Sequence, residues 1–182
     1  MSDFQLYKKN PTAGEITSSL TGSNDGQGLH FDGAANTFVD CGVTTILDGA
    51  SRMSVEVISA TSSTTASRII GKQASDDGFK LQQNADGTLS ALVANGLTTA
   101  TATTSGTYND GNPKHIVVTW DAATVSIYVN GNLDGTATLA GGSIPSTADR
   151  LALGAYLYGN GTTNGSNFDG IIYRARLWNK TL

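Results

Sequence analysis

The carboxylate side chains limit the chemistry that this sequence could perform. Hydrolysis of a glycosidic bond needs two carboxyl groups that flank the bond, about 5–10 Å apart. The chain has two glutamates, Glu15 and Glu56, and Glu56 lies in the strand-like segment MSVEVIS with no second carboxylate two or four residues away. The 13 aspartates occur mainly in Asp-Gly turns. We therefore expect no glycosidase chemistry from this chain.

Nucleophilic catalysis and zinc binding are no better supported. The two histidines, His30 and His115, are not near a G-x-S-x-G segment, which the sequence lacks. Cys41 is the one cysteine, so it forms no internal disulfide, and we expect a small semi-buried side chain rather than a reactive thiol. No His/Cys cluster has zinc-ligand spacing and no phosphate-binding loop is present. The prediction is that the protein is not an enzyme.

The elements that must position any functional residue are β-strands, as the composition indicates. The chain has 22 glycines, 24 threonines and 17 serines, which suit short strands joined by tight turns. Helix-forming residues are sparse, which excludes a helical bundle. Hydrophobic residues make up 38% of the chain, enough to build a core and to exclude disorder.

Charge and length narrow the class of protein further. The net charge is −4 and the 11 lysines and arginines are scattered, so no basic surface for nucleic acid is expected. No apolar run is long enough to span a membrane, and the first residues do not resemble a secretory signal peptide. We expect one domain at this length. The initial methionine and the strand-like last segment count against a fragment of a larger protein.

Alternating apolar residues and turn signals predict about a dozen short strands. Asp86-Gly87 and Asn130-Gly131 are signals for two-residue hairpins, and segment 98–104, TTATATT, is typical of an exposed edge strand. Segment 44–50 could hold one helical turn. Strands are expected at residues 28–32, 37–41, 53–59, 67–73, 78–84, 88–95, 98–104, 115–120, 124–131, 151–157 and 170–178. This pattern predicts an all-β, two-sheet antiparallel jelly-roll sandwich.

Residues 1–24 differ from the rest of the chain. They combine a short apolar patch, two lysines and a polar stretch, so we predict an N-terminal arm or linker before a domain at 25–182. One interpretation is a frayed terminus. The other is an arm that docks on a neighbouring subunit or scaffold, through Phe4, Leu6, Tyr7, Lys8, Lys9 and Pro11.

Three segments carry a family resemblance. They are GLHFDGAANTFVDCG (28–42), KHIVVTWDAATVSIYVNGNLDGT (114–136) and FDGIIYRARLWNKTL (168–182). In this order they resemble laminin-G-like domains of the concanavalin A-like lectin/glucanase fold, and LALGAY (151–156) matches the strand before the closing one. The resemblance implies a sandwich whose first and last strands are neighbours in one sheet. It covers residues 28–182.

The resemblance also bears on function. Laminarinase-like enzymes of this fold use two glutamates on one strand, and Glu56 alone does not meet that pattern. Where the family often has two acids after the last isoleucine, this chain has Tyr173 and Arg174. Asp32 and Asp169, each within Phe-Asp-Gly, are expected to stabilise turns rather than bind metal.

Calcium remains an option, because many laminin-G-like and pentraxin-like domains hold it at the rim. Calcium takes six to eight oxygen ligands. Asp76 and Asp77 are the predicted carboxylate ligands if a site exists, and no other cofactor is expected. Segment 159–170 has one carboxylate and several asparagines, and its alternative interpretation is a polar rim loop.

Two functions are consistent with these features. The first is a structural or display module on a virion surface, such as a capsid decoration or tail protein. Its expected partners are other virion proteins and copies of itself, for example in a trimer. The second is an extracellular lectin-like module that binds glycans, with or without calcium. The residues predicted to bind a sugar are Tyr108, Tyr156, Tyr158, Asn160 and Asn164.

Overall fold

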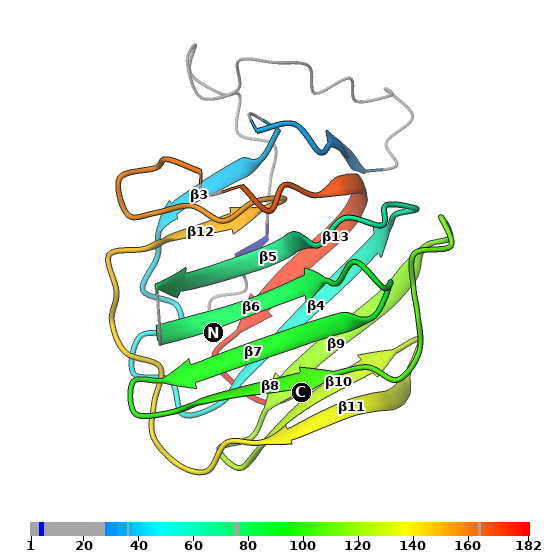
Figure 1. Ribbon diagram of the computed structural model, residues 1–182. Coiled ribbons are helices and arrows are strands. Elements are labelled where there is room, and N and C mark those ends of the chain that lie inside the picture. The colour runs from blue at the N-terminus through cyan, green and yellow to red at the C-terminus, as the bar shows by residue number, and fades with distance from the viewer. Residues whose placement is uncertain (1–3, 6–27, 36, 75–76, 164) are drawn as a thin grey trace.

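The computed structural model describes residues 4–5, 28–35, 37–74, 77–163 and 165–182. The predicted antiparallel jelly-roll sandwich is confirmed, because these residues form thirteen strands in two stacked sheets (Figure 1). Within the described ranges, no helix is long and apolar enough to span a membrane.

Sheet A contains the first and last strands of the described residues. Its order is β1-β13-β4-β9-β10-β11, and β2 pairs with the same edge of β13 as β1 does. The bounds are β1 (Phe4–Gln5), β2 (Leu29–Asp32), β4 (Met53–Ala60), β9 (Lys114–Trp120), β10 (Thr124–Val129), β11 (Asn132–Thr138) and β13 (Asp169–Trp178).

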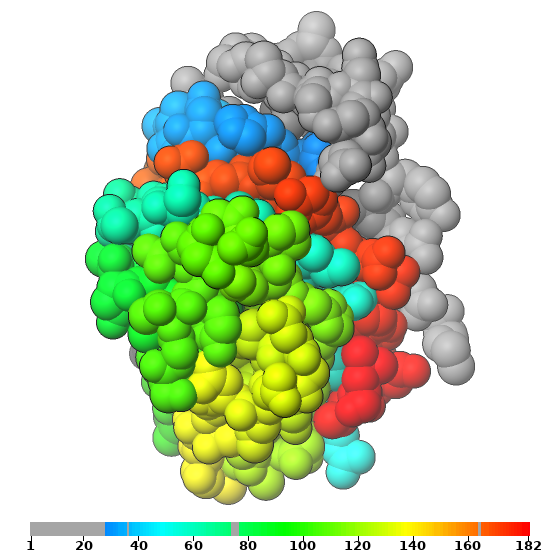
Figure 2. Space-filling model, turned by 90° about the vertical axis from the view of Figure 1, so that its right-hand side faces the viewer, coloured from blue at the N-terminus to red at the C-terminus, as the bar shows by residue number. Residues whose placement is uncertain are grey.

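Sheet B lies in front of sheet A in Figure 1 and has the order β3-β12-β5-β6-β7-β8. The bounds are β3 (Val39–Val43), β5 (Ser67–Ala74), β6 (Asp77–Gln83), β7 (Leu89–Asn95), β8 (Thr99–Thr103) and β12 (Arg150–Leu153). In the side view of Figure 2, the green β6–β8 part of sheet B and the red end of β13 lie on opposite sides of the molecule.

The strand predictions hold with a few differences. Strand β8 is an edge strand, as its small polar residues predict. Asn130 and Gly131 both have positive φ and form the predicted two-residue hairpin. The Asp86-Gly87 connection is longer, because it spans 84–88, with Gly87 N donating to the Asn84 carbonyl. The prediction omitted β11, whose residues lack a regular apolar alternation.

The core lies between the sheets and is built from alternate residues of the strands. Val125, Ile127 and Val129 of β10 are all buried, as their shared parity predicts. The Trp120 indole is fully buried and donates through Nε1 to the Leu139 carbonyl at 3.0 Å, so its polar atom is satisfied.

The first and last domain strands are neighbours, as expected from the Phe-Asp-Gly segments. Asp32 lies opposite Asp169 in the β2–β13 ladder, and the buried rings of Phe31 and Phe168 meet edge to face with centroids 6.0 Å apart. The Asp32 carboxylate accepts bonds from the Ala34 amide and the Thr37 hydroxyl, which lower its pKa, the Thr37 bond most. These contacts support a structural role for Asp32.

Candidate functional site: the outer face of sheet B

The face of sheet B turned away from sheet A carries a row of polar side chains. The strand register places Arg68 of β5 opposite Gln82 of β6, which is opposite Ser90 of β7, which is opposite Thr103 of β8. Their neighbours Leu81 and Ala91 are buried in the core. Four side chains with hydrogen-bonding groups therefore cross four adjacent strands on one face.

Hydrogen bonds connect most of this row. Gln82 donates to Asn84, Asn84 donates to the Ser90 hydroxyl at 2.7 Å, and the Ser90 and Thr103 hydroxyls lie 3.2 Å apart. Linked amide and hydroxyl groups fix one another's orientation, so the row presents an ordered set of donors and acceptors.

Arg68 occupies one end of the row in an unusual environment. A register shift between Arg68 and Ile70 places Arg68 and Gly71 on the same outer face. The Arg68 side chain lies over Gly71, where an added Cβ would come within 3.2 Å of Cδ and Nη1, and Nη2 donates to Gln73 at 3.2 Å. Arg68 is 7% exposed, and its Nε and Nη1 have no hydrogen-bond partner.

An aromatic ring covers this arginine, and a second ring packs against the first. The Tyr156 ring stacks on the Arg68 guanidinium, with Cζ 4.6 Å from the ring centre, and Tyr158 packs edge to face on Tyr156 with centroids 5.0 Å apart. Tyr158 is 41% exposed, so the pair offers one ring to solvent. We call Arg68, Gln73, Lys80, Gln82, Tyr156 and Tyr158 the Arg68 patch.

The loop that carries the tyrosines is fastened to β5 at both of its ends. Gly154 N donates to the Ile69 carbonyl, and the Arg68 amide donates to the Ser166 carbonyl. Phe168 N donates to the Gly154 carbonyl at 2.8 Å, which closes the loop at its base. These backbone bonds hold the loop beside the outer face of sheet B.

Lys80 adds a second positive charge to the patch. It lies opposite Gly71 in the β5–β6 ladder and is half-buried. Burial, and secondly the charge of Arg68, lower the pKa of Lys80. Burial lowers the pKa of Arg68 to about 10, so the guanidinium still carries its charge at neutral pH. The two cations repel each other.

The structure brings some of the predicted sugar-binding residues together. Tyr156 and Tyr158 are in contact, and Asn160 lies in the same loop, where its side chain accepts bonds from the amide and hydroxyl of Thr162. Asn160 therefore stabilises a turn. Asn164 lies outside the described residues.

Tyr108 lies apart from that pair. It follows β8, which β5, β6 and β7 separate from β12 in sheet B, and its hydroxyl donates to Asp134 of β11. Burial and this hydrogen bond raise the pKa of Tyr108 to about 12. These contacts give Tyr108 a role in joining the two sheets.

Only part of the predicted arm and metal site can be placed. Phe4 and Gln5 form β1 beside β13, whereas Leu6, Tyr7, Lys8, Lys9 and Pro11 lie outside the described residues. Asp76 is also outside them. Asp77 begins β6, and among the described residues no three His, Cys, Asp or Glu side chains gather as a metal site. The calcium expectation stays a prediction.

The outer face of sheet A has a charged cluster in which the charges are paired. The Glu56 carboxylate lies 3.0 Å from His115 Nε2, 3.3 Å from Arg176 and 3.9 Å from Arg174. The cations of this cluster therefore share one carboxylate partner, whereas neither cation of the Arg68 patch has one among the described residues.

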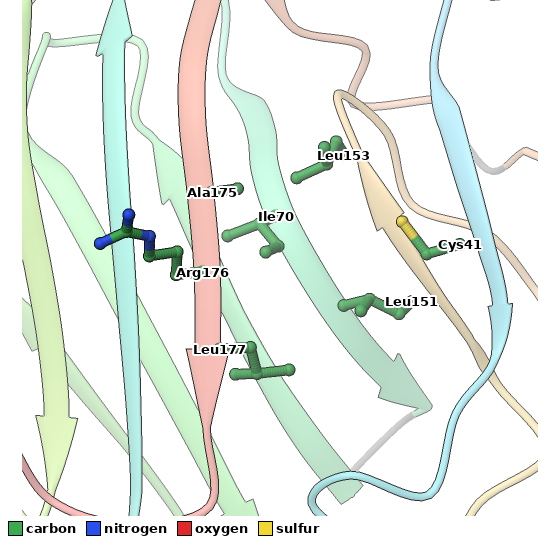
Figure 3. A pocket seen from close by; sticks show the side chains of 7 residues that line it. All are labelled: Cys41, Ile70, Leu151, Leu153, Ala175, Arg176 and Leu177. Atoms are coloured by element: carbon green, nitrogen blue, oxygen red, sulfur yellow. The ribbon is translucent and has the colours of Figure 1, made fainter. Parts of the chain in front are cut away.

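A small cavity of about 10 Å³ lies between the sheets (Figure 3). Cys41 of β3, Ile70 of β5, Leu151 and Leu153 of β12, and Ala175 and Leu177 of β13 line it, while the Arg176 guanidinium points away. About one water molecule is the most that such a volume admits, so this cavity holds no sugar. Burial, and then Asp40, raise the pKa of the Cys41 thiol to about 12.

The comparisons with known proteins agree with this architecture. The family model of the concanavalin A-like lectin/glucanases superfamily matches residues 32–182. The chain belongs to this superfamily. No curated protein sequence matches the chain.

Solved structures share the fold at low sequence identity. A heptameric SAP-like pentraxin from Limulus polyphemus has a TM-score of 0.64 and 16% identity, covering 84% of this chain and 76% of the pentraxin. Domains LG4-5 of the mouse laminin alpha1 chain have a TM-score of 0.63 and 20% identity, covering 84% of this chain and 43% of the laminin chain. The CBM40 domain of Ruminococcus gnavus IT-sialidase, bound to α2,3-sialyllactose, has a TM-score of 0.60 and 16% identity, covering 76% of this chain and 79% of the CBM40 chain.

Proposed function

We propose that this superfamily member is a non-catalytic carbohydrate-binding module whose ligand contacts the Arg68 patch. The observation that carries the proposal is the Tyr156–Tyr158 pair, with the Tyr158 ring exposed, beside the polar row on sheet B. Sugar rings offer apolar faces and hydroxyl edges. An aromatic side chain with nearby amide, hydroxyl and charged groups supplies complementary contacts to both.

The surroundings of the patch support this proposal. Gln82 and Lys80 are half-buried at alternate positions of β6, so both present polar groups on the same face of the sheet. The Gln82 amide is held by its bond to Asn84, which lowers the entropic cost of binding through it. The structural neighbour CBM40 was solved with sialyllactose bound, which shows that this architecture can carry a sugar site in another protein.

The proposed absence of catalysis rests on Glu56. A glycosidase needs a second carboxyl group across the scissile bond. The Glu56 carboxylate instead accepts from His115 and Arg176, and it is only 13% exposed. This arrangement suits a structural ion-pair cluster on sheet A.

Calorimetric titration with oligosaccharides selected on a glycan array tests the proposal. Tyr158→Ala should weaken binding of a selected glycan about tenfold, because it removes the exposed ring. Tyr128→Ala, on sheet A, is the matched control and should bind normally. No binding to any array glycan, with or without calcium, would refute the proposal, and calcium-dependent binding would support the predicted role of Asp76 and Asp77.

A second candidate is a display module on a virion surface, docked through the N-terminal arm. The observation that favours it is β1, because Phe4 pairs with Leu177 and Gln5 with Arg176 at the edge of β13. The same pairing could be made with a neighbouring copy in an oligomer. Light scattering of the chain with and without residues 1–24 tests this candidate, which fails if deletion leaves assembly unchanged.

A further inference from the structure

Two positively charged side chains of the Arg68 patch lack an anionic partner. In the described part of the chain, the ion pairs of lysine and arginine involve Lys72, Lys114, Arg150, Arg174 and Arg176. Arg68 and Lys80 form none. Asp149 interacts electrostatically with Tyr156 and with Lys72, but among the described ion pairs none joins it to either cation of the patch.

This arrangement is unfavourable in the free protein. Burying a charged group without a partner costs free energy, and Arg68 is buried with Nε and Nη1 unpaired. Placing Lys80 beside it adds repulsion between like charges. A buried polar group without a partner calls for an explanation, and a bound anion supplies one.

We propose that the Arg68 patch binds the carboxylate of an acidic sugar, which pairs with Lys80 and the Arg68 guanidinium. This inference rests on the proposed carbohydrate-binding function and names its ligand class. The shared charge chemistry would also suit a sulfate ester, which can accept the same paired hydrogen bonds from a guanidinium. The carboxylate is the smaller group, so it needs less displacement of the Tyr156 ring that covers Arg68.

The geometry explains how the ligand reaches Arg68. Nε and Nη1 are covered in the free protein, and the Tyr156 ring lies over the guanidinium. Pairing with Arg68 therefore requires the partly buried Tyr156 side chain to turn outward while the backbone bonds keep the loop on β5. Lys80, which is half-buried on the same face, makes the first contact, and Arg68 pairs once Tyr156 has turned.

The test compares ligands that differ only in charge. Calorimetry measures binding of an oligogalacturonate, of its carboxyl-reduced neutral counterpart and of a sulfated form of that neutral counterpart. We expect the carboxylated form to bind at least about tenfold more tightly than the neutral one, with the preference falling as salt is added. The sulfated form should bind more weakly than the carboxylated one.

Variants of Lys80 distinguish a loss of ligand binding that comes from the missing charge from one that comes from misfolding. Lys80→Gln should lose most of the preference for the carboxylated ligand yet raise the melting temperature of the free protein by about 2 °C, because the repulsion of Arg68 is relieved. Lys80→Arg should keep the preference. Lys114→Gln is the matched control, since Lys114 is paired with Asp110, and it should keep the preference without gaining stability.

The outcomes distinguish the two proposals. Equal binding of the charged and neutral forms overturns the carboxylate inference and leaves the carbohydrate-binding proposal standing. Tighter binding of the sulfated form overturns the choice of a carboxylate. If none of these ligands binds and the glycan array is also negative, both proposals fail.

Discussion

The guanidinium carbon of Arg68 lies 4.6 Å from the centre of the Tyr156 ring. This contact joins a strand of sheet B to the loop that follows β12, so it fixes the loop and covers the charge at once. A cation–π contact is worth about 0.5–2 kcal/mol. Such a contact offsets part of the cost of the buried charge but replaces no hydrogen bond of Nε or Nη1.

Removal of the Tyr156 ring should expose the guanidinium and loosen the loop. We expect Tyr156→Ala to lower the free energy of unfolding by about 1 kcal/mol, measured by urea denaturation. Tyr156→Phe keeps the ring face and should match the unmodified protein. Equal loss in the two variants would mean that the hydroxyl, rather than the ring, stabilises the loop.

Phe168 should be among the most costly residues to truncate. It is fully buried against Phe31 where the first and last domain strands meet, so Phe168→Ala should lower the free energy of unfolding by about 3–5 kcal/mol. Arg174→Ala, on the exposed face of the same strand, should change it by less than about 0.5 kcal/mol. Denaturant curves of both variants measure the difference, and a similar loss for both would contradict the packing argument.

Tyr108 should make stability fall at alkaline pH. Its pKa is raised to about 12 in the folded protein, by burial and the hydrogen bond to Asp134, whereas an unfolded tyrosine titrates near 10. Between these values the unfolded chain has lost a proton that the folded one keeps, so stability falls as pH rises from 10 to 12. Tyr108→Phe has no phenol proton to lose, so its free energy of unfolding should fall less between pH 10 and pH 12. Denaturant unfolding curves of both proteins across that pH range measure the difference.

The Cys41 thiol should react slowly while the protein is folded. Its pKa is raised to about 12, mainly by burial, and the thiolate is the reactive form. At pH 8.5 we expect an aromatic disulfide reagent to label the folded protein at least about a hundredfold more slowly than the protein in concentrated urea. Rapid labelling of the folded protein would show that the thiol is open to solvent. Asp40→Asn should accelerate labelling only slightly, since Asp40 is the smaller cause of the shift.

The sequence predicted the fold well because strand alternation and turn residues are local signals. The parity of Val125, Ile127 and Val129 and the Asn130-Gly131 turn each follow from neighbouring residues. Strand β11 was missed because Gly135 and the polar residues around it carry no alternation, and its pairing with β10 determines its structure.

The candidate site was only partly predictable. Tyr156 and Tyr158 are two residues apart, so their proximity could be expected from the sequence. Arg68 and Lys80 were missed, because only the β5–β6 register and the bulge before Ile70 bring their charges together. Gly71, a glycine inside a strand, was a local sign that another group packs closely against β5.

Strand β13 also determines when the protein can fold during its synthesis. It lies between β4 on one side and β1 and β2 on the other, so the earliest strands of sheet A have no complete sheet to join until the last one exists. Residues 169–178 must therefore emerge from the ribosome before sheet A can be completed. Until then, the exposed edge of β4 is open to other nascent chains, which makes chaperone binding during translation valuable.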